Sequence, residues 1–446
     1  MRSVSILLIA ITVAVAGTLW VRLESTPPRV ETLEGPIPVG ENYVHEVRIS
    51  DPESGVESVR VWIDTPAGER VLYEQRYPGN LLLGADSELE QLISFPVPPR
   101  DLGIPDGPAS LQIEVTDYSL RGNRSTQEVA LSIDTRPPRV ALLTGLTYIR
   151  RGGAEAAVYG VDELVEIDGI QIGESLHPGF SHPEREDLRI AFYALSPDPE
   201  SPSPEVVAID PAGNETRVPL SLGIIERGFP TDRIELSEAF MQRKVAELGA
   251  SGEGTPAARY LELNRGLRER SHEKLREISV NSSADRLWEG RFAQLPNSKV
   301  VAIFGEQRSY VYDGEAIDSQ LHQGYDLASI AHAKVPAANH GVVAFAGPLG
   351  IYGNTVVIDH GLGLASLYGH LSEITVESGR AVRKGDSLGR TGQTGLAGGD
   401  HLHFAMLVNG EFVDPLEWFD PKWLREHIEP KLVTEPADEA AAGAGA

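Results

Sequence analysis

An internal repeat in the first half of the chain limits the folds that it can adopt. The segment Thr26-Pro27-Pro28-Arg29-Val30 returns as Thr135-Arg136-Pro137-Pro138-Arg139-Val140. An aspartate ahead of Gly122-Asn123 likewise returns as Asp210 ahead of Gly213-Asn214. Runs of alternating apolar residues lie between these markers and are typical of short strands. The repeat therefore predicts two β-sandwich modules of immunoglobulin-like type, at residues 27–134 and 135–223.

A helical pattern begins after the second module. Apolar residues recur at helical spacing from Leu236 to Leu248 and again from Tyr260 to Ile278. We interpret residues 231–296 as a helical linker pair, with a partner-binding arm as the alternative. From about Asn297 the chain is rich in glycine and strand-like runs, which predicts a further β domain at residues 297–423. Residues 436–446 are alanine, glycine and acid, a composition typical of a disordered tail.

The N-terminus indicates export from the cytoplasm. No charged residue occurs from Val4 to Val21, and about 18 apolar residues is the short limit for a membrane span. Ala14-Val15-Ala16 resembles a cleavage site, but the apolar stretch continues beyond it. We expect residues 1–23 to form an uncleaved, single-pass anchor in the inner (cell) membrane, with a cleaved signal peptide as the alternative. Either segment would place the bulk of the chain in the periplasm or otherwise outside the cytoplasm.

Composition excludes several classes of partner and site. The chain has 65 acidic and 39 basic residues, and its net charge of −26 argues against a nucleic-acid partner. It contains no cysteine, which excludes disulfides and zinc sites built on thiolates. Any metal must therefore be held by histidine, aspartate or glutamate.

Seven of the twelve histidines lie between His322 and His403, in a region with two notable patterns. One is His322-Gln323-Gly324-Tyr325-Asp326, and the other is His401-Leu402-His403-Phe404. In a strand, residues two or four apart face the same side, so each pattern would aim its polar side chains into one groove. Two imidazoles and one carboxylate suit Zn²⁺ and leave a fourth position open, as catalytic zinc sites do. Either pattern alone also occurs in proteins that bind no metal.

The two patterns belong to a longer match. From about Phe304 to Trp418 the sequence resembles the lysostaphin/LytM-type zinc metallopeptidases, also called the glycyl-glycine endopeptidase family, with its duplicated hybrid motif. Besides the two histidine patterns, the segments that carry the resemblance are Phe304-Gly305, Val335-Pro336-Ala337, Gly353-Asn354-Thr355-Val356-Val357-Ile358-Asp359-His360-Gly361, Leu367-Tyr368-Gly369-His370-Leu371-Ser372 and Asp414-Pro415. The match covers about a quarter of the chain and says nothing about the N-terminal modules.

The resemblance implies roles for five residues. His322, Asp326 and His403 match the metal ligands, and His370 and His401 match the two catalytic histidines that do not bind the metal. All five positions are filled, whereas relatives without ligands act as non-enzymatic activators of cell-wall amidases. His360 is expected to support the groove, and the scattered His45, His177 and His182 are expected to be solvated.

Together these features predict a multidomain, mainly β protein with a C-terminal antiparallel β peptidase domain. We expect a zinc metalloendopeptidase that hydrolyses peptide bonds in the stem or cross-link peptides of peptidoglycan during cell wall remodelling. Two alternatives remain open. One is a non-catalytic amidase activator or scaffold whose β-modules or helices bind a protein partner. The other is a peptidase that acts on an exported protein.

Overall fold

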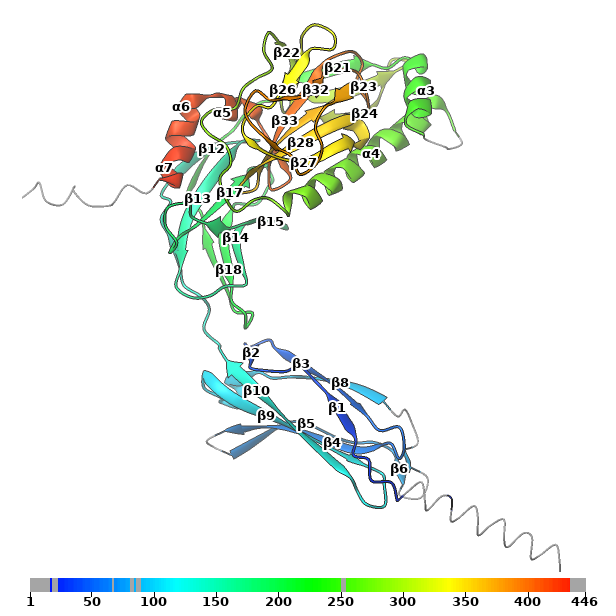
Figure 1. Ribbon diagram of the computed structural model, residues 1–446, viewed down its shortest axis with the longest axis vertical. Coiled ribbons are helices and arrows are strands. Elements are labelled where there is room, and N and C mark those ends of the chain that lie inside the picture. Colours follow the sequence, from blue (N-terminus) through cyan, green and yellow to red (C-terminus); the bar gives the residue numbers. More distant parts are fainter. Residues whose placement is uncertain are drawn as a thin grey trace, which may run out of the picture. The chain divides into compact units, whose positions relative to one another are not determined.

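A computed structural model describes residues 17, 23–65, 68–80, 84–85, 90–249 and 254–433 (Figure 1). The fold is mainly β, as predicted, and the chain forms two compact units. The first comprises the chain up to Pro138 together with Glu163–Glu166 and Ile209–Thr216. The second comprises the remainder from Arg139 onward. The predicted disordered tail lies outside the described residues, and so does the predicted anchor apart from Gly17 and Leu23.

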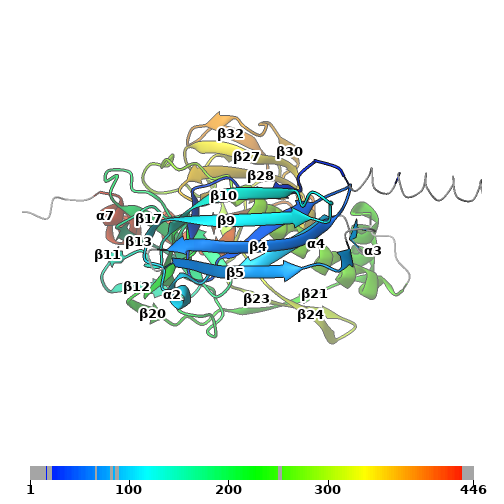
Figure 2. The same ribbon diagram turned by 90° about the horizontal axis from the view of Figure 1, so that it is seen from below.

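The first unit is built on two sheets that share one core. Its hydrophobic cluster combines Val47, Ile49 and Phe95 from one sheet with Val61 and Ile113 from the other, so the sheets pack face to face. Figure 2 shows the larger sheet face on, with its strands side by side. The smaller sheet has the order β1 (Arg29–Glu31), β3 (Val44–Ser50), β8 (Glu90–Pro96), and the larger has β2 (Ile37–Val39), β10 (Arg124–Ile133), β9 (Gly107–Asp117), β4 (Val56–Thr65), β5 (Gly68–Arg76).

Hydrogen bonds explain why the Asp and Gly-Asn motif recurs. Asn123 Nδ2 donates to Asp117 Oδ2 at 2.9 Å and to the backbone oxygen of Glu24 at 3.3 Å. Asn214 Nδ2 donates to Asp210 Oδ2 at 2.8 Å and to the backbone oxygen of Asp134 at 2.9 Å. Each asparagine therefore ties a closing turn to the segment that leads into the same repeat. The immunoglobulin-like type of the two modules stays a prediction.

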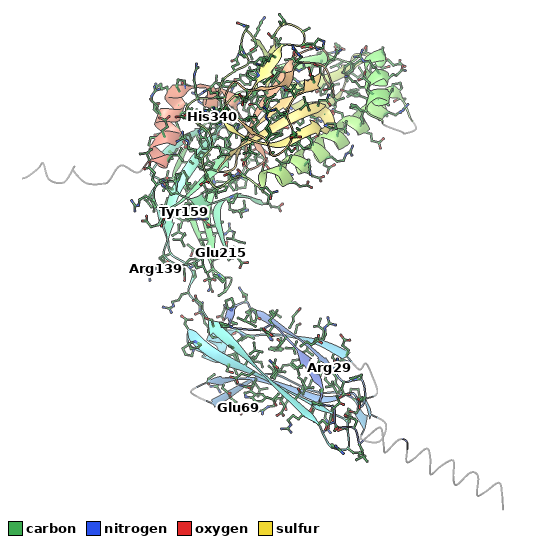
Figure 3. All side chains as sticks on the ribbon, in the orientation of Figure 1. Arg29, Glu69, Arg139, Tyr159, Glu215 and His340 are labelled. Atoms are coloured by element: carbon green, nitrogen blue, oxygen red, sulfur yellow. The ribbon has the colours of Figure 1, made fainter. Side chains whose placement is uncertain are left out.

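The second β-module packs against the C-terminal domain rather than standing apart from it. Its strands β13 (Ala154–Val161) and β17 (Arg189–Ala194) are buried on both faces. One face, with Tyr159 and Tyr193, packs within the module, and Tyr159, labelled in Figure 3, donates to Asp168 Oδ2 at 2.6 Å. The other face includes Phe192, whose ring centroid lies 5.8 Å from Trp288 and 6.4 Å from Trp418. The prediction assigned Phe192 to a module at 135–223 and Trp418 to a separate domain at 297–423, but the two side chains belong to one hydrophobic core.

The remaining strands of this module complete its sheets. Strands β13 and β17 belong to the order β11 (Val140–Leu142), β13, β17, β16 (Phe180–Ser181). A second sheet has the order β15 (Ser175–Pro178), β14 (Ile167–Ile172), β18 (Glu205–Ile209), β19 (Glu215–Pro219), and a two-stranded sheet joins β12 (Thr147–Arg150) to β20 (Leu222–Ile225).

The expectation that three scattered histidines are solvated is wrong. His45, His177 and His182 are all buried, with at most 3% of their surface exposed. Each has polar partners: His45, for example, contacts the hydroxyls of Thr32 at 2.8 Å and Tyr43 at 2.9 Å. Isolated histidines carry no local pattern that would reveal such partners.

Two helices and a strand occupy the predicted linker. Ser237 caps the N-terminus of helix α3 (Glu238–Glu247), where its hydroxyl accepts from the Phe240 amide. Thr255 likewise caps α4 (Pro256–Ser279) and accepts from the Ala258 amide. The helices share a small apolar cluster with Tyr310 of the C-terminal domain. The linker is not wholly helical, because β21 (Thr231–Glu235) pairs in parallel with β23 (Gln307–Tyr312), which in turn pairs with β24 (Glu315–Leu321).

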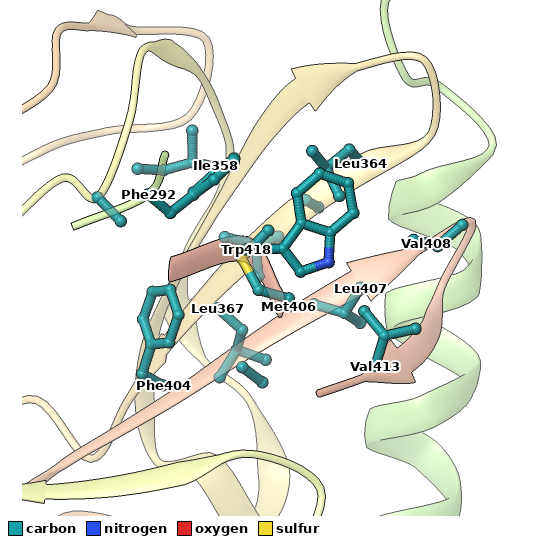
Figure 4. Close-up of a cluster of buried hydrophobic side chains, with 14 of the residues drawn as sticks. Phe292, Ile358, Leu364, Leu367, Phe404, Met406, Leu407, Val408, Val413 and Trp418 are labelled. Carbon is teal, nitrogen blue, oxygen red and sulfur yellow. The ribbon is translucent and has the colours of Figure 1, made fainter. Parts of the chain in front are cut away.

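The C-terminal domain is organised around one large antiparallel sheet. Figure 4 shows its core, where Trp418 is fully buried among aliphatic side chains and Phe292 and Phe404. The sheet has the order β22 (Lys299–Ala302), β25 (Tyr325–Ala328), β33 (Leu402–Val408), β29 (Leu364–Gly369), β28 (Asn354–Gly361), β27 (Gly341–Pro348), β31 (Ala381–Val382), with β34 (Glu411–Val413) also beside β33. A second sheet has the order β26 (Lys334–Pro336), β32 (Ser387–Arg390), β30 (Glu373–Ile374).

Among the described residues, no helix combines the length and apolar character needed to cross a membrane.

Candidate active site

Strand pairing places the candidate residues beside one another. In the register of β25 and β33, Asp326 lies directly opposite His403. On the other side of β33, Gly369 at the end of β29 is also opposite His403, and His370 follows it. The sheet thus gathers residues from three separate segments at one point.

His322 reaches the same point through a bend rather than a strand. The prediction of a continuous strand from His322 to Asp326 is wrong, because β25 begins only at Tyr325. A Cβ on Gly324 would lie 2.7 Å from the backbone oxygen of Phe404 and 2.8 Å from His403 Nε2. The absent side chain therefore allows His322 and His403 to approach each other across the bend.

Changing Gly324 to alanine is expected to disturb this approach. The added methyl group meets backbone and a buried imidazole, so we expect a loss of about 1–3 kcal/mol in stability and a metal affinity at least about 10-fold weaker. Thermal unfolding and competitive metal titration would measure the two effects. Gly347→Ala is the matched control, since a Cβ there would meet only Phe345 at an ordinary 3.5 Å. Equal metal affinity in the two variants would contradict the role given to Gly324.

Three potential ligand atoms converge at the cluster. His322 Nε2 lies 3.0 Å from Asp326 Oδ1 and 3.2 Å from His403 Nδ1, and His403 Nδ1 lies 2.9 Å from Asp326 Oδ1. Ligands bound at 2.0–2.1 Å to one tetrahedral ion are about 3.3 Å apart. All three side chains are buried, with at most 7% of each residue exposed. The spacing and donor set therefore fit a shared metal ion.

The tautomer of His322 supports the same conclusion. Its Nδ1–H donates to the backbone oxygen of Ile303 at 2.9 Å, and a carbonyl can only accept. In the neutral imidazole, Nε2 then presents a lone pair to the carboxylate oxygen of Asp326. Two lone pairs facing each other in a buried site repel unless a cation lies between them.

Arg308 supports Asp326 from behind and was not foreseen from the sequence. Its Nη2 donates to Asp326 Oδ2 at 2.7 Å, and its Nε donates to Glu306 Oε1 at 3.1 Å. Burial alone would raise the pKa of Asp326, but the neighbouring imidazoles, His322 foremost, hold it well below its usual value. Burial lowers the pKa of His403 to about 4, so its imidazole is neutral and able to bind a metal at pH 7.

His370 and His401 form the second pair. Their ring centroids lie 4.8 Å apart, and His401 Nε2 lies 3.4 Å from Asp326 Oδ1. His370 Nδ1 donates to the backbone oxygen of Thr394 at 2.8 Å, and His401 Nδ1 donates to that of Gly399 at 2.9 Å. In each ring, therefore, a backbone carbonyl holds one nitrogen, and Nε2 is the atom left to exchange protons.

The other histidines of the region have structural partners. His360 is fully buried between the backbone oxygen of His340 at 2.6 Å and the hydroxyl of Ser366 at 2.7 Å. His332 Nδ1 contacts the hydroxyl of Ser372 at 3.1 Å. The structure thus brings together the five predicted site residues and keeps His360 outside the cluster.

The cluster opens into a cavity of about 420 Å³. One wall comes from the linker, which the sequence did not indicate: β21, the start of α3, and α4 all line it. Lys244 of α3 joins this wall to the loop at Gln393, since its Nζ donates to the backbone oxygen of Gln393 at 3.4 Å. Tyr352 packs within the site, with its ring centroid 5.2 Å from that of His403.

Comparison with known proteins identifies this domain. Residues 320–415 match the family described as Peptidase family M23. The DD-carboxypeptidase/endopeptidase Mpg of Neisseria meningitidis is 41% identical over 97 residues, which are 22% of this chain and 22% of that protein. The peptidoglycan DD-endopeptidase ShyA of Vibrio cholerae is 36% identical over 96 residues, again 22% of each chain. The chain thus matches about a fifth of the length of these curated relatives.

The solved structures that resemble this chain include the catalytic domain of lysostaphin from Staphylococcus simulans. It is 28% identical with a TM-score of 0.26, and the match covers 29% of this chain and 98% of that domain. The match at residues 320–415 agrees with the resemblance carried by the two histidine patterns. This part of the chain is a peptidase family M23 domain of the lysostaphin/LytM type.

Proposed function

We propose that the protein is a zinc-dependent endopeptidase that hydrolyses peptide bonds in the stem or cross-link peptides of peptidoglycan, for cell wall remodelling. The observation that carries the proposal is the convergence of His322, Asp326 and His403 beside a second imidazole pair. The names of the curated relatives, a DD-carboxypeptidase/endopeptidase and a peptidoglycan DD-endopeptidase, support this class of substrate.

In this proposal His322, Asp326 and His403 hold the zinc ion. Two nitrogens and one oxygen are a common catalytic set for zinc, and Arg308 fixes the carboxylate through its second oxygen. When bound, Zn²⁺ polarises a carbonyl and makes water acidic enough to react near neutral pH.

His370 and His401 handle the proton transfers and the developing oxyanion. Each ring is oriented by a backbone carbonyl, so Nε2 of each is available to the substrate without rearrangement. Both residues line the cavity that contains the three ligands. This arrangement provides proton acceptors and donors on one side of a bound peptide bond.

The rest of the chain would bring the domain to its substrate. We propose that residues 1–23 anchor the protein in the cell membrane, with the bulk outside the cytoplasm, where peptidoglycan is found. The two β-modules, proposed to be immunoglobulin-like, and the helices are then available to a protein partner.

Digestion of purified cell wall tests the proposal. The zinc-loaded wild type is expected to release new peptide ends, identified by mass spectrometry of the muropeptides, and His403→Ala is expected to release none. Equal release by both proteins would refute the enzyme hypothesis. Cleavage of an unfolded protein substrate without any cleavage of wall would favour a peptidase for exported proteins instead.

A further inference from the structure

Arg268 is a cation in the wall of the cavity that contains the metal cluster. It lies on α4 and is half-buried. The cavity is lined by Arg268 together with His322, Asp326 and His403. A residue of the linker therefore faces the same space as the residues proposed to cut the substrate.

The hydrogen-bond partners of Arg268 are all neutral. Its Nε donates to Asn264 Oδ1 at 3.0 Å, and its Nη2 donates to the hydroxyl of Tyr310 at 3.4 Å. In the part of the chain that the structure describes, Arg268 forms no ion pair, whereas nearby Arg265 and Arg308 each bind a carboxylate.

The guanidinium is held in place from one side. Asn264 is fully buried, and its Nδ2 donates to Asp318 Oδ2 at 3.5 Å. Asp318 is fixed in turn by Arg265 at 2.9 Å. An arginine oriented in this way keeps its remaining N–H donors in a planar fork, which matches the geometry of a carboxylate.

Tyr352 links Arg268 to the reacting centre. Both residues line the cavity that contains the metal cluster. The ring of Tyr352 also packs on His403. Because an extended peptide advances about 3.3–3.6 Å per residue, a cavity of this size holds only a few residues. A group bound to Arg268 would therefore lie close to the scissile bond.

We propose that Arg268 binds a free carboxylate of the substrate near the scissile bond and so selects anionic peptides. The inference rests on the proposed peptidase function and names the class of peptide that this site takes. The carboxylate is either the C-terminal group of the peptide or a side-chain group next to the bond that is cut. Arg268 acts as a specificity residue in this account, and Asn264 positions it.

Chemical amidation of the substrate tests the proposal. Muropeptides are compared before and after their carboxylates are converted to amides, with the zinc-loaded full chain as enzyme. The wild type is expected to lose about 10–100-fold in kcat/KM on the amidated peptides. Arg268→Gln is expected to lose a similar factor on the native peptides and to show no further loss on the amidated ones. Arg268→Lys should recover part of the preference.

Arg270→Gln provides the matched control. Arg270 lies on the same helix, is exposed and does not line the cavity, so this variant should discriminate as the wild type does. Zinc content and the unfolding midpoint should be the same in all three variants. If Arg268→Gln keeps the full preference for native peptides, the proposal is wrong.

A binding measurement separates this proposal from the peptidase function. Native and amidated muropeptides are titrated calorimetrically into the same zinc-loaded proteins. Where a protein cleaves a peptide, its digested fragments are titrated instead. Tighter binding of native peptides that requires Arg268 would support the proposal even if no bond is cut. Equal binding of both peptide sets by the wild type, or no binding at all, would overturn it.

Discussion

Asp326→Asn is expected to abolish peptide hydrolysis and to leave the protein with little zinc. Asp326 Oδ1 lies within 3.0 Å of both His322 Nε2 and His403 Nδ1, so its charge is at the centre of the proposed site. Asparagine keeps the size of the side chain but removes that charge. Residues that merely support metal ligands change affinity by about 10–100-fold, so the loss of a charged ligand should exceed 100-fold. Turnover should fall by about 1,000-fold or more.

Two measurements are needed to attribute this effect to the metal. Competitive titration gives the zinc affinity, and muropeptide release gives the turnover at saturating zinc. Asp359→Asn is a suitable control, because Asp359 accepts hydrogen bonds from Ser282 and Ser283 away from the site. A variant at Asp326 that binds zinc and turns over as the wild type does would remove the basis for the proposed centre.

The five candidate residues could be selected from the sequence because they lie in two short patterns and one longer match. Asp326 and His403 are 77 positions apart, yet each belongs to a local motif that signals its chemistry. Their pairing across β25 and β33 agrees with the idea that strands bring both motifs to one groove. The bend at Gly324 was missed, because a strand and a bend at the glycine would both place His322 beside Asp326. The sequence pattern therefore does not distinguish the two.

Residues without a local pattern could not be predicted. Arg308 acts on Asp326 through a contact between β23 and β25, and nothing in its own segment marks it. Arg268 faces the cavity only because α4 packs beside the domain. The shared core at Phe192 and Trp418 has the same cause: apolar residues in one strand do not reveal which distant surface covers them.

The shared core contains a carboxyl group that should make stability depend on pH. Glu417 is buried, and its Oε2 accepts from the Ala154 amide at 2.9 Å. Burial, together with the nearby carboxylates Asp414 and Glu155, raises the pKa of Glu417 to about 8. Between about pH 4.5, where the unfolded chain ionises, and about pH 8, the folded state therefore binds more protons than the unfolded state.

Stability should accordingly fall as pH rises through this range. The loss attributable to Glu417 is expected to be about 3–5 kcal/mol between pH 5 and pH 8, because each unit of pKa shift corresponds to about 1.4 kcal/mol. Glu417→Gln retains an acceptor for the Ala154 amide and has no proton to lose. The variant should therefore gain stability relative to the wild type as pH rises, measured as the difference in unfolding midpoint at pH 5, 6, 7 and 8.

The control for this titration is Glu426→Gln, which replaces an exposed side chain in the same C-terminal stretch. Because Glu417 is intact in that variant, its stability should decline with pH as steeply as that of the wild type. If Glu417→Gln and the wild type instead lose stability in parallel from pH 5 to pH 8, then Glu417 is ionised in the folded protein. The interface between the second β-module and the peptidase domain would then hold a buried negative charge beside Asp414 and Glu155. Burial of Glu417 next to these two carboxylates argues against that outcome.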